Sequence, residues 1–115
     1  MAETYELPID QGGTLQVPFF LKDENGTALN LTGYSARMQM RTSYNATVPS
    51  LSLSSTDGSI TIDAALGKLT LNATAATTAS LAARRYVYDI EIVSPSGFVT
   101  RIVQGNAVVS PEVTR

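Results

Sequence analysis

The chain has 115 residues, of which 43% are hydrophobic and 16% are charged, and its formal net charge is -2. These values are typical of one globular domain, and they argue against disorder and against a basic surface for nucleic acid or membranes. The sequence contains no His and no Cys. It therefore lacks the commonest general base, a thiolate nucleophile, disulfides and the most frequent ligands of transition metals.

The first six residues, Met-Ala-Glu-Thr-Tyr-Glu, are acidic and polar. They have neither the positively charged segment nor the apolar segment of a secretory signal peptide. No apolar run in the sequence approaches the length that spans a bilayer. We therefore expect a protein that stays in the cytosol or is assembled there into a larger particle.

The N-terminal part of the sequence predicts short strands separated by turns. Residues 5–9 are a short β-like lead-in, and in the next segment Leu15, Val17 and Phe19 alternate onto one face. Pro18 cannot donate a hydrogen bond to a neighbouring strand, which predicts an edge position or a bulge there. Asn25-Gly26 then supplies a tight hairpin turn.

Residues 34–41 form the clearest amphipathic strand of the sequence, with Arg37 and Arg41 on its polar face. Residues 43–50 are polar and contain a proline, which indicates a loop or a weak edge. Shorter apolar alternations follow, up to residue 71. Residues 73–83 are rich in Ala and Thr, and they predict at most one short helical turn near 74–83.

A hairpin over residues 86–109 is the strongest secondary-structure signal, because two β-rich runs flank a turn that contains Pro and Gly. In its first run Tyr86 to Ile92 alternate toward a core, and in its second run Ile102 and Val108 are assigned to that core. In immunoglobulin-type sandwiches a tyrosine at this place bonds back to upstream backbone and fixes the corner between the sheets. We predict this structural role for Tyr86.

The number and spacing of these elements predict the fold class. About seven to nine short antiparallel strands, with a turn signal every eight to twelve residues, are typical of an all-β, immunoglobulin-like sandwich. No composition shift marks a linker, so we expect a single domain over residues 1–115.

The residue types that carry chemistry form no convincing site. Asp89 and Glu91 share a strand face, but alternate carboxylates are more often a solvated sheet face than an acid–base pair. The turns at 23–25 and 57–58 lack the ligand spacing of a calcium loop. We therefore predict no enzyme, no catalytic residues, no cofactor and no metal.

The sequence does offer candidates for a protein interface, because arginine is enriched where proteins meet and strand edges accept partner strands. Tyr44 is the aromatic residue that falls in a polar loop and not on an alternating strand. The predicted interface residues are Tyr5, Leu7, Ile9, Pro18, Arg37, Arg41, Tyr44, Arg84 and Arg85.

The order of the turn and strand motifs resembles small β-sandwich virion proteins of tailed bacteriophages. It is also similar to the N-terminal domain of siphophage upper baseplate proteins. The motifs that carry the resemblance lie at residues 10–15, 23–26, 31–41, 67–71, 77–78, 86–90, 96–97, 105–109 and 113–115.

The resemblance implies a virion protein, assembled in the host cytoplasm. Its expected function is a tail or baseplate adaptor or fibre-docking connector that binds neighbouring subunits through strand edges and polar sheet faces. Expected partners are other virion proteins and further copies of the chain, without nucleic acid or membrane. A capsid decoration (cement) protein is the first alternative, and a carbohydrate-binding β-sandwich module is the second.

Overall fold

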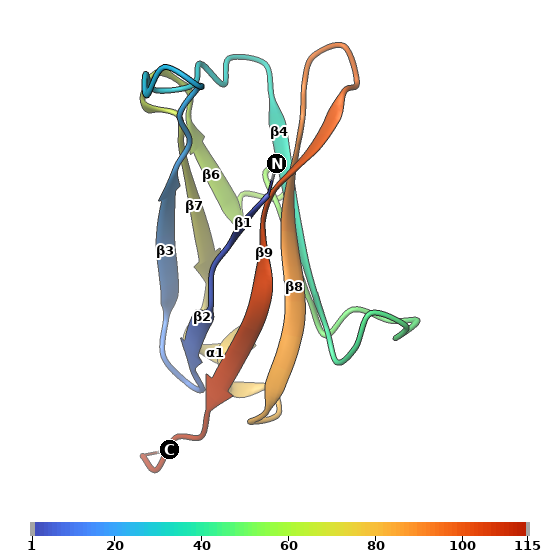
Figure 1. Ribbon diagram of the computed structural model, residues 1–115. Helices are drawn as coiled ribbons and strands as arrows, with labels where there is room; N and C mark the ends of the chain where they lie inside the picture. The colour runs from blue at the N-terminus through green and yellow to red at the C-terminus, as the bar shows by residue number, and fades with distance from the viewer. Residues whose placement is uncertain (1, 115) are drawn as a thin grey trace.

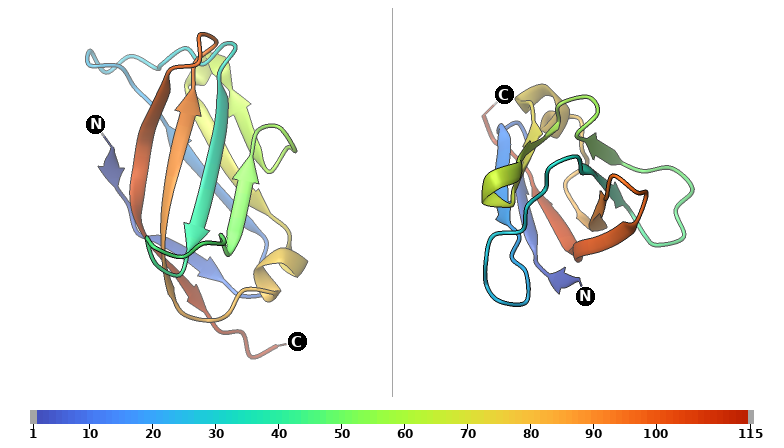
Figure 2. Two further views of the ribbon diagram at one scale, coloured as in Figure 1. Left: turned by 90° about the vertical axis from the view of Figure 1, so that its right-hand side faces the viewer. Right: turned by 90° about the horizontal axis from the view of Figure 1, so that it is seen from above.

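The computed structural model describes residues 2–114, which form two β-sheets packed face to face around one apolar core (Figure 1). The predicted all-β, immunoglobulin-like sandwich is confirmed. Met1 and Arg115, the ends of the predicted domain, lie outside the described residues. Two further views show the larger sheet face-on and the sandwich from above (Figure 2).

The described residues contain nine strands in two sheets. The larger sheet has the order β1-β9-β8-β4-β5, with β2 also paired to β9, and the smaller sheet has the order β3-β7-β6. The strands are β1 Glu3–Thr4, β2 Leu7–Asp10, β3 Leu15–Phe20, β4 Ser35–Arg41, β5 Leu51–Ser54, β6 Ile60–Asp63, β7 Lys68–Ala73, β8 Arg85–Val93 and β9 Val99–Ser110.

The N-terminal strands depart from the antiparallel pairing that the sequence predicted. Both β1 and β2 run parallel to β9, with Leu7 opposite Ala107 and Ile9 opposite Val109. The N-terminal segment pairs with β9 and not with its sequence neighbour β3. A short turn can join only antiparallel strands, but β2 and β9 are joined by most of the chain, so they are free to pair in parallel.

Two short helical segments complete the fold. The 3₁₀ helix η1 covers Ala64–Leu66, and α1 covers Ala75–Ala79, within the predicted helical region. The Thr74 side chain caps α1 by accepting a hydrogen bond from the Thr77 amide at 3.2 Å. Thr78 is fully buried, and its hydroxyl donates to the Gly13 carbonyl at 2.8 Å. The helix is therefore fastened to the turn before β3.

The core follows the alternation predicted for β4 and β8. Met38 and Met40 of β4 and Ile90 of β8 are fully buried, and Tyr86 and Tyr88 also point inward. Full burial of an apolar side chain of this size contributes about 1.5–3 kcal/mol. Strands β8 and β4, which are neighbours within the larger sheet, thus supply much of its core-facing side.

Strand β9 does not keep the predicted alternation. Ile90 pairs with Val103 and Glu91 pairs with Arg101, which leaves Ile102 as the extra residue of a β-bulge. After the bulge the odd-numbered residues face inward, so Val109 is buried whereas Val108 is only partly buried. The prediction for Val108 is wrong because one inserted residue exchanges the two faces of a strand. Ile102 is partly buried and packs at the rim of the core.

Candidate functional site

Two of the predicted interface residues lie in the core. Leu7 is 0% exposed and Ile9 is 1% exposed, because the pairing of β2 with β9 directs both side chains between the sheets. A partner protein cannot contact them in the folded chain. Their assignment to an interface is wrong, and the alternation Leu-Pro-Ile at this position is a core signal.

Tyr5 joins the N-terminal segment to both sheets. Its carbonyl accepts a hydrogen bond from the Tyr88 hydroxyl at 2.7 Å, and its amide donates to the Gln104 carbonyl at 2.9 Å. Burial raises the pKa of Tyr88, so its hydroxyl keeps its proton for this bond. The Tyr5 ring packs edge-on against Phe19, with 5.4 Å between centroids. Tyr5 is therefore chiefly a structural residue, although 43% of it is exposed.

Tyr86 occupies the corner between the sheets. Its hydroxyl donates to the Ala82 carbonyl at 2.7 Å, which is the backbone contact of a tyrosine corner. The Arg84 guanidinium lies over the Tyr86 ring, 5.4 Å from its centroid. Arg85, the residue directly before Tyr86, makes an exposed ion pair of 3.6 Å with Glu6. Such a pair contributes little to stability.

Three strand edges are obstructed, which argues against the addition of a partner strand at β2, β3 or β5. Pro18 lies exposed on β3, an edge strand of the smaller sheet, and Pro8 lies exposed on β2. Neither residue has an amide hydrogen to offer an added strand. On β5, the Ser54 amide already donates to the Ser59 hydroxyl at 2.8 Å, and that hydroxyl also bonds to the Asp57 carboxylate.

Residues 42–50, which connect β4 to β5, form a projecting loop that we call the tyrosine loop (green, lower right in Figure 1). Tyr44 is 85% exposed and Val48 is 72% exposed. The Arg41 guanidinium donates to the Ala46 carbonyl at 2.7 Å. From the other side, Arg84 donates to the Thr42 carbonyl at 3.3 Å. The fold thus gathers three predicted interface residues, Arg41, Tyr44 and Arg84, at one loop.

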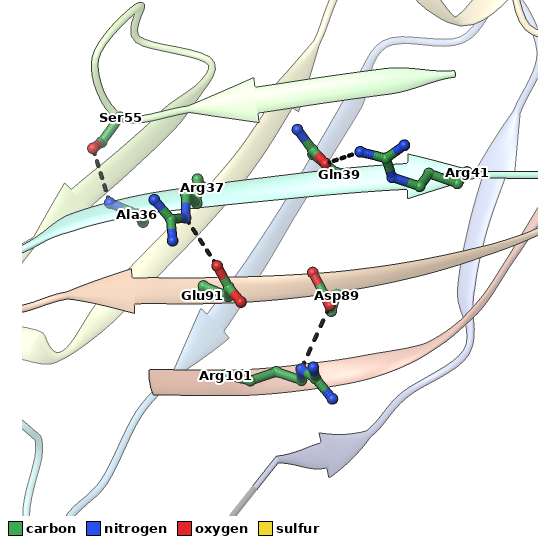
Figure 3. A network of polar contacts seen from close by, with 8 residues as sticks. All are labelled: Ala36, Arg37, Gln39, Arg41, Ser55, Asp89, Glu91 and Arg101. Atoms are coloured by element: carbon green, nitrogen blue, oxygen red, sulfur yellow. Dashed lines mark hydrogen bonds and ion pairs between the residues drawn. The ribbon is translucent and has the colours of Figure 1, made fainter. Parts of the chain in front are cut away.

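The outer face of the larger sheet carries alternating charges (Figure 3). Arg37 pairs with Glu91 at 2.9 Å, and Arg101 pairs with Asp89 at 3.5 Å. Burial, and then the Glu91 charge, raise the pKa of Asp89, while the neighbouring arginines oppose this rise. The side chains are more than a quarter exposed, so each pair contributes about 0–1 kcal/mol.

A groove that the sequence analysis missed lies between the sheets, near the start of β4. It has a volume of about 330 Å³, and we call it the aromatic groove. Phe20 and Phe98 are 59% and 72% exposed, and the Lys68 ammonium lies 5.7 Å from the Phe20 centroid. The apolar residues that line it include Phe19, Phe20, Tyr34, Ile92, Phe98 and Ile102.

The sequence contains a signal that Phe20 and Phe98 are exposed. Phe20 directly follows Phe19, so only one of them can face the core of a strand. Phe98 adjoins the Pro- and Gly-containing turn of the hairpin, where no neighbouring strand covers it. An exposed aromatic pair of this kind marks a surface that can bind a partner.

The described residues offer no set of side chains for a metal. Within residues 2–114, no three Asp or Glu side chains come together. His and Cys, which bind copper and zinc in most proteins, do not occur in the sequence. The sulfur-bearing side chains of Met38 and Met40 are buried in the core. No helix in this part of the chain is long and apolar enough to cross a membrane.

Comparison with known proteins gives the fold a precedent. A scan against protein-family models finds no match, and a search of the curated proteins finds no similar sequence. Among solved structures, the chain is similar to the crystal structure of CopC from Methylosinus trichosporium OB3b. The TM-score is 0.51, the identity is 15%, and the match covers 96% of this chain and 88% of that chain. The chain has a CopC-like fold.

This finding contradicts the predicted phage identity. The resemblance to tailed-phage virion proteins, the tail or baseplate function and the virion localisation are wrong, because the matching structure is CopC. The alternatives of a capsid decoration protein and a carbohydrate-binding module gain no support from this match. Turn residues such as Asn25-Gly26 and alternating strands are common to many β-sandwiches, so their order indicates the architecture but does not identify a family.

Proposed function

We propose that the chain is a non-catalytic protein-binding module and that the tyrosine loop is its recognition element. The observation that carries the proposal is the pair of exposed side chains, Tyr44 and Val48, on a loop whose backbone is braced by two guanidinium groups. A braced loop loses less conformational freedom when it binds. Tyrosine is among the residues that dominate protein interfaces.

The state of the polar side chains supports a non-catalytic role. Asp89 and Glu91 each have an arginine partner, so neither stands free to exchange a proton with a substrate. The sequence has no His or Cys to serve as a base or a nucleophile. The CopC-like fold is compatible with this role.

The charge distribution favours a protein partner over nucleic acid or a membrane surface. Basic and acidic side chains alternate on the outer sheet face, and the net charge is -2. A nucleic-acid or membrane surface would instead need a continuous basic patch. The uncharged tyrosine loop is suited to a contact in which apolar surface is buried.

Site-specific photo-crosslinking in the cells that produce the protein tests the proposal. A photoreactive phenylalanine analogue in place of Tyr44 should trap a protein in a discrete complex. The same analogue in place of Thr61, exposed on β6, serves as the control and should trap none. Equal labelling at both positions, or no complex at Tyr44, would contradict the proposal.

A further inference from the structure

We infer that a partner of the tyrosine loop is a second copy of the chain, whose aromatic groove receives Tyr44 and Val48. This inference rests on the proposed binding role of the loop. One chain presents both an exposed aromatic projection and an exposed aromatic recess. The contact would be made by insertion of the loop and not by addition of a strand.

The groove has the size and lining for one aromatic side chain with a small apolar neighbour. Its volume of about 330 Å³ is at the lower end of the range for ligand pockets. Phe20 comes from the smaller sheet and Phe98 from the β8–β9 turn, so an inserted ring would contact aromatic groups from both sheets. Aromatic pairs of this kind gain stability beyond the area that they bury.

The polar atoms at the groove suit the hydroxyl of an inserted tyrosine. Thr100 lines the groove and carries a hydroxyl group, whereas the Ser94 hydroxyl already accepts a hydrogen bond from the Phe98 amide. The charged side chains of Glu3, Lys22 and Arg101 also line the groove. Residues 42–50 contain no charged side chain, so the loop itself brings no further charge into the groove. A tyrosine fits such a site because its ring is apolar and its hydroxyl finds a hydrogen-bond partner.

The two surfaces lie at opposite ends of β4. Tyr34, at the start of β4, lines the groove, whereas Thr42 opens the loop at the other end of that seven-residue strand. Seven strand residues span roughly 23 Å, and the loop and the β8–β9 turn lie at opposite ends in Figure 1 and in the left view of Figure 2. The contact therefore joins two copies: it either repeats from copy to copy in a heterologous arrangement or is made twice in an antiparallel two-fold dimer.

The contact area indicates a weak association. A fully covered aromatic side chain buries about 150–250 Å², but Tyr44, Phe20 and Phe98 are only 85%, 59% and 72% exposed, so each can bury only part of that area on association. Even with Val48 and the surrounding backbone, the contact falls below the limit of about 1,000 Å² for a specific, stable interface and in the range of weak contacts. We therefore expect association that rises with concentration between about 10 µM and 1 mM.

Sedimentation velocity of the whole chain and of two single variants tests the inference. The unmodified protein should show assemblies that grow with concentration. Tyr44→Ala removes the projection and Phe98→Ala removes one wall of the groove, and each should weaken self-association by at least about tenfold. An equimolar mixture of the two variants should restore a one-to-one dimer, because one variant keeps its groove and the other keeps its loop.

Val113→Ala is the matched control, since Val113 is an exposed apolar residue outside both surfaces, and it should assemble as the unmodified protein does. Far-UV circular dichroism checks that each variant is folded. A chain that stays monomeric at every concentration overturns the inference. So does self-association that persists in either variant, or a mixture that gives no dimer. A monomeric chain that still crosslinks a different protein at Tyr44 retains the proposed function and removes only this inference.

Discussion

Tyr86 and Tyr44 are the same residue type, each has an arginine nearby, and they have opposite roles. The Tyr86 ring is buried, and its hydroxyl is bonded to the backbone of the preceding turn. The Tyr44 ring is exposed, and the neighbouring arginines donate to the loop backbone and not to the ring. Burial of the ring separates the two roles, because Arg84 itself both lies over Tyr86 and donates to Thr42 of the loop. A ring held in the core fixes the fold, whereas a ring left exposed on a braced loop is available for binding.

The largest expected effect is in the buried region. Ile90→Ala removes a fully buried side chain from β8, and the resulting cavity should lower the free energy of unfolding by about 2–5 kcal/mol. Urea unfolding at neutral pH measures the change. Crosslinking at Tyr44 below the unfolding transition should be unaffected. A near-neutral variant would mean that β8 presents the opposite face to the core.

A matched pair of hydroxyl deletions tests the comparison directly. Tyr86→Phe leaves the Ala82 carbonyl without its donor, and we expect a loss of about 1–3 kcal/mol in unfolding free energy. Tyr44→Phe deletes an exposed hydroxyl and should change the unfolding free energy by less than about 0.5 kcal/mol. Equal effects at the two positions would contradict the assignment of separate roles.

Arg84 belongs to both regions, since it lies over Tyr86 and donates to Thr42. Arg84→Ala should cost about 0.5–1 kcal/mol, the value of an exposed cation–π contact. It should also speed hydrogen exchange of the amides of residues 42–50. Arg85→Ala is the control, because its ion pair with Glu6 is remote from the loop backbone. Unchanged exchange in the Arg84 variant would show that Arg41 alone orders the loop.

The smallest expected effect concerns Asp89 on the outer sheet face. Its pKa is raised from 3.8 in the folded state, chiefly by burial, so the folded chain holds this proton more tightly than the unfolded chain. The corresponding stability is present below pH 3.8 and is lost as the pH rises through the folded-state pKa. Asp89→Asn should therefore gain a few tenths of a kcal/mol relative to the unmodified chain between acidic and neutral pH.

Thermal unfolding of both proteins at several pH values measures this difference. A stability difference that shifts in favour of the unmodified chain as the pH rises would mean that the ion pair with Arg101 outweighs burial at this position. Glu91→Gln is a useful second variant, because Glu91 raises the pKa of Asp89. Its removal should reduce the pH dependence that Asp89 causes.

Much of the fold could be predicted because its central strands obey alternation. Met38, Met40 and Ile90 point inward as a period of two requires. The bulge at Ile102 could not be predicted, because neither residue directly beside it is a Gly or a Pro that would mark an irregular position. The parallel pairing of β2 with β9 also left no local signal, since it joins residues that are a hundred positions apart.

The candidate site was predictable only in part. Tyr44 stood out because it is an aromatic residue in a polar segment, but the bonds from Arg41 to Ala46 and from Arg84 to Thr42 depend on tertiary placement. The aromatic groove requires two sheets and a turn to meet, so no single stretch of sequence encodes it. Phe20 and Phe98 are far apart in sequence and line one groove only in the folded chain.

The parallel strand β2 has a consequence for how the chain folds. Its partner β9 follows about a hundred residues later in the chain, so Leu7 and Ile9 have no partner strand until the ribosome has made β9. Long-range pairings of this kind slow folding, and unpaired apolar segments invite aggregation in the meantime. Pro8 lies between the two residues and offers no amide hydrogen to an added strand, which should limit such aggregation.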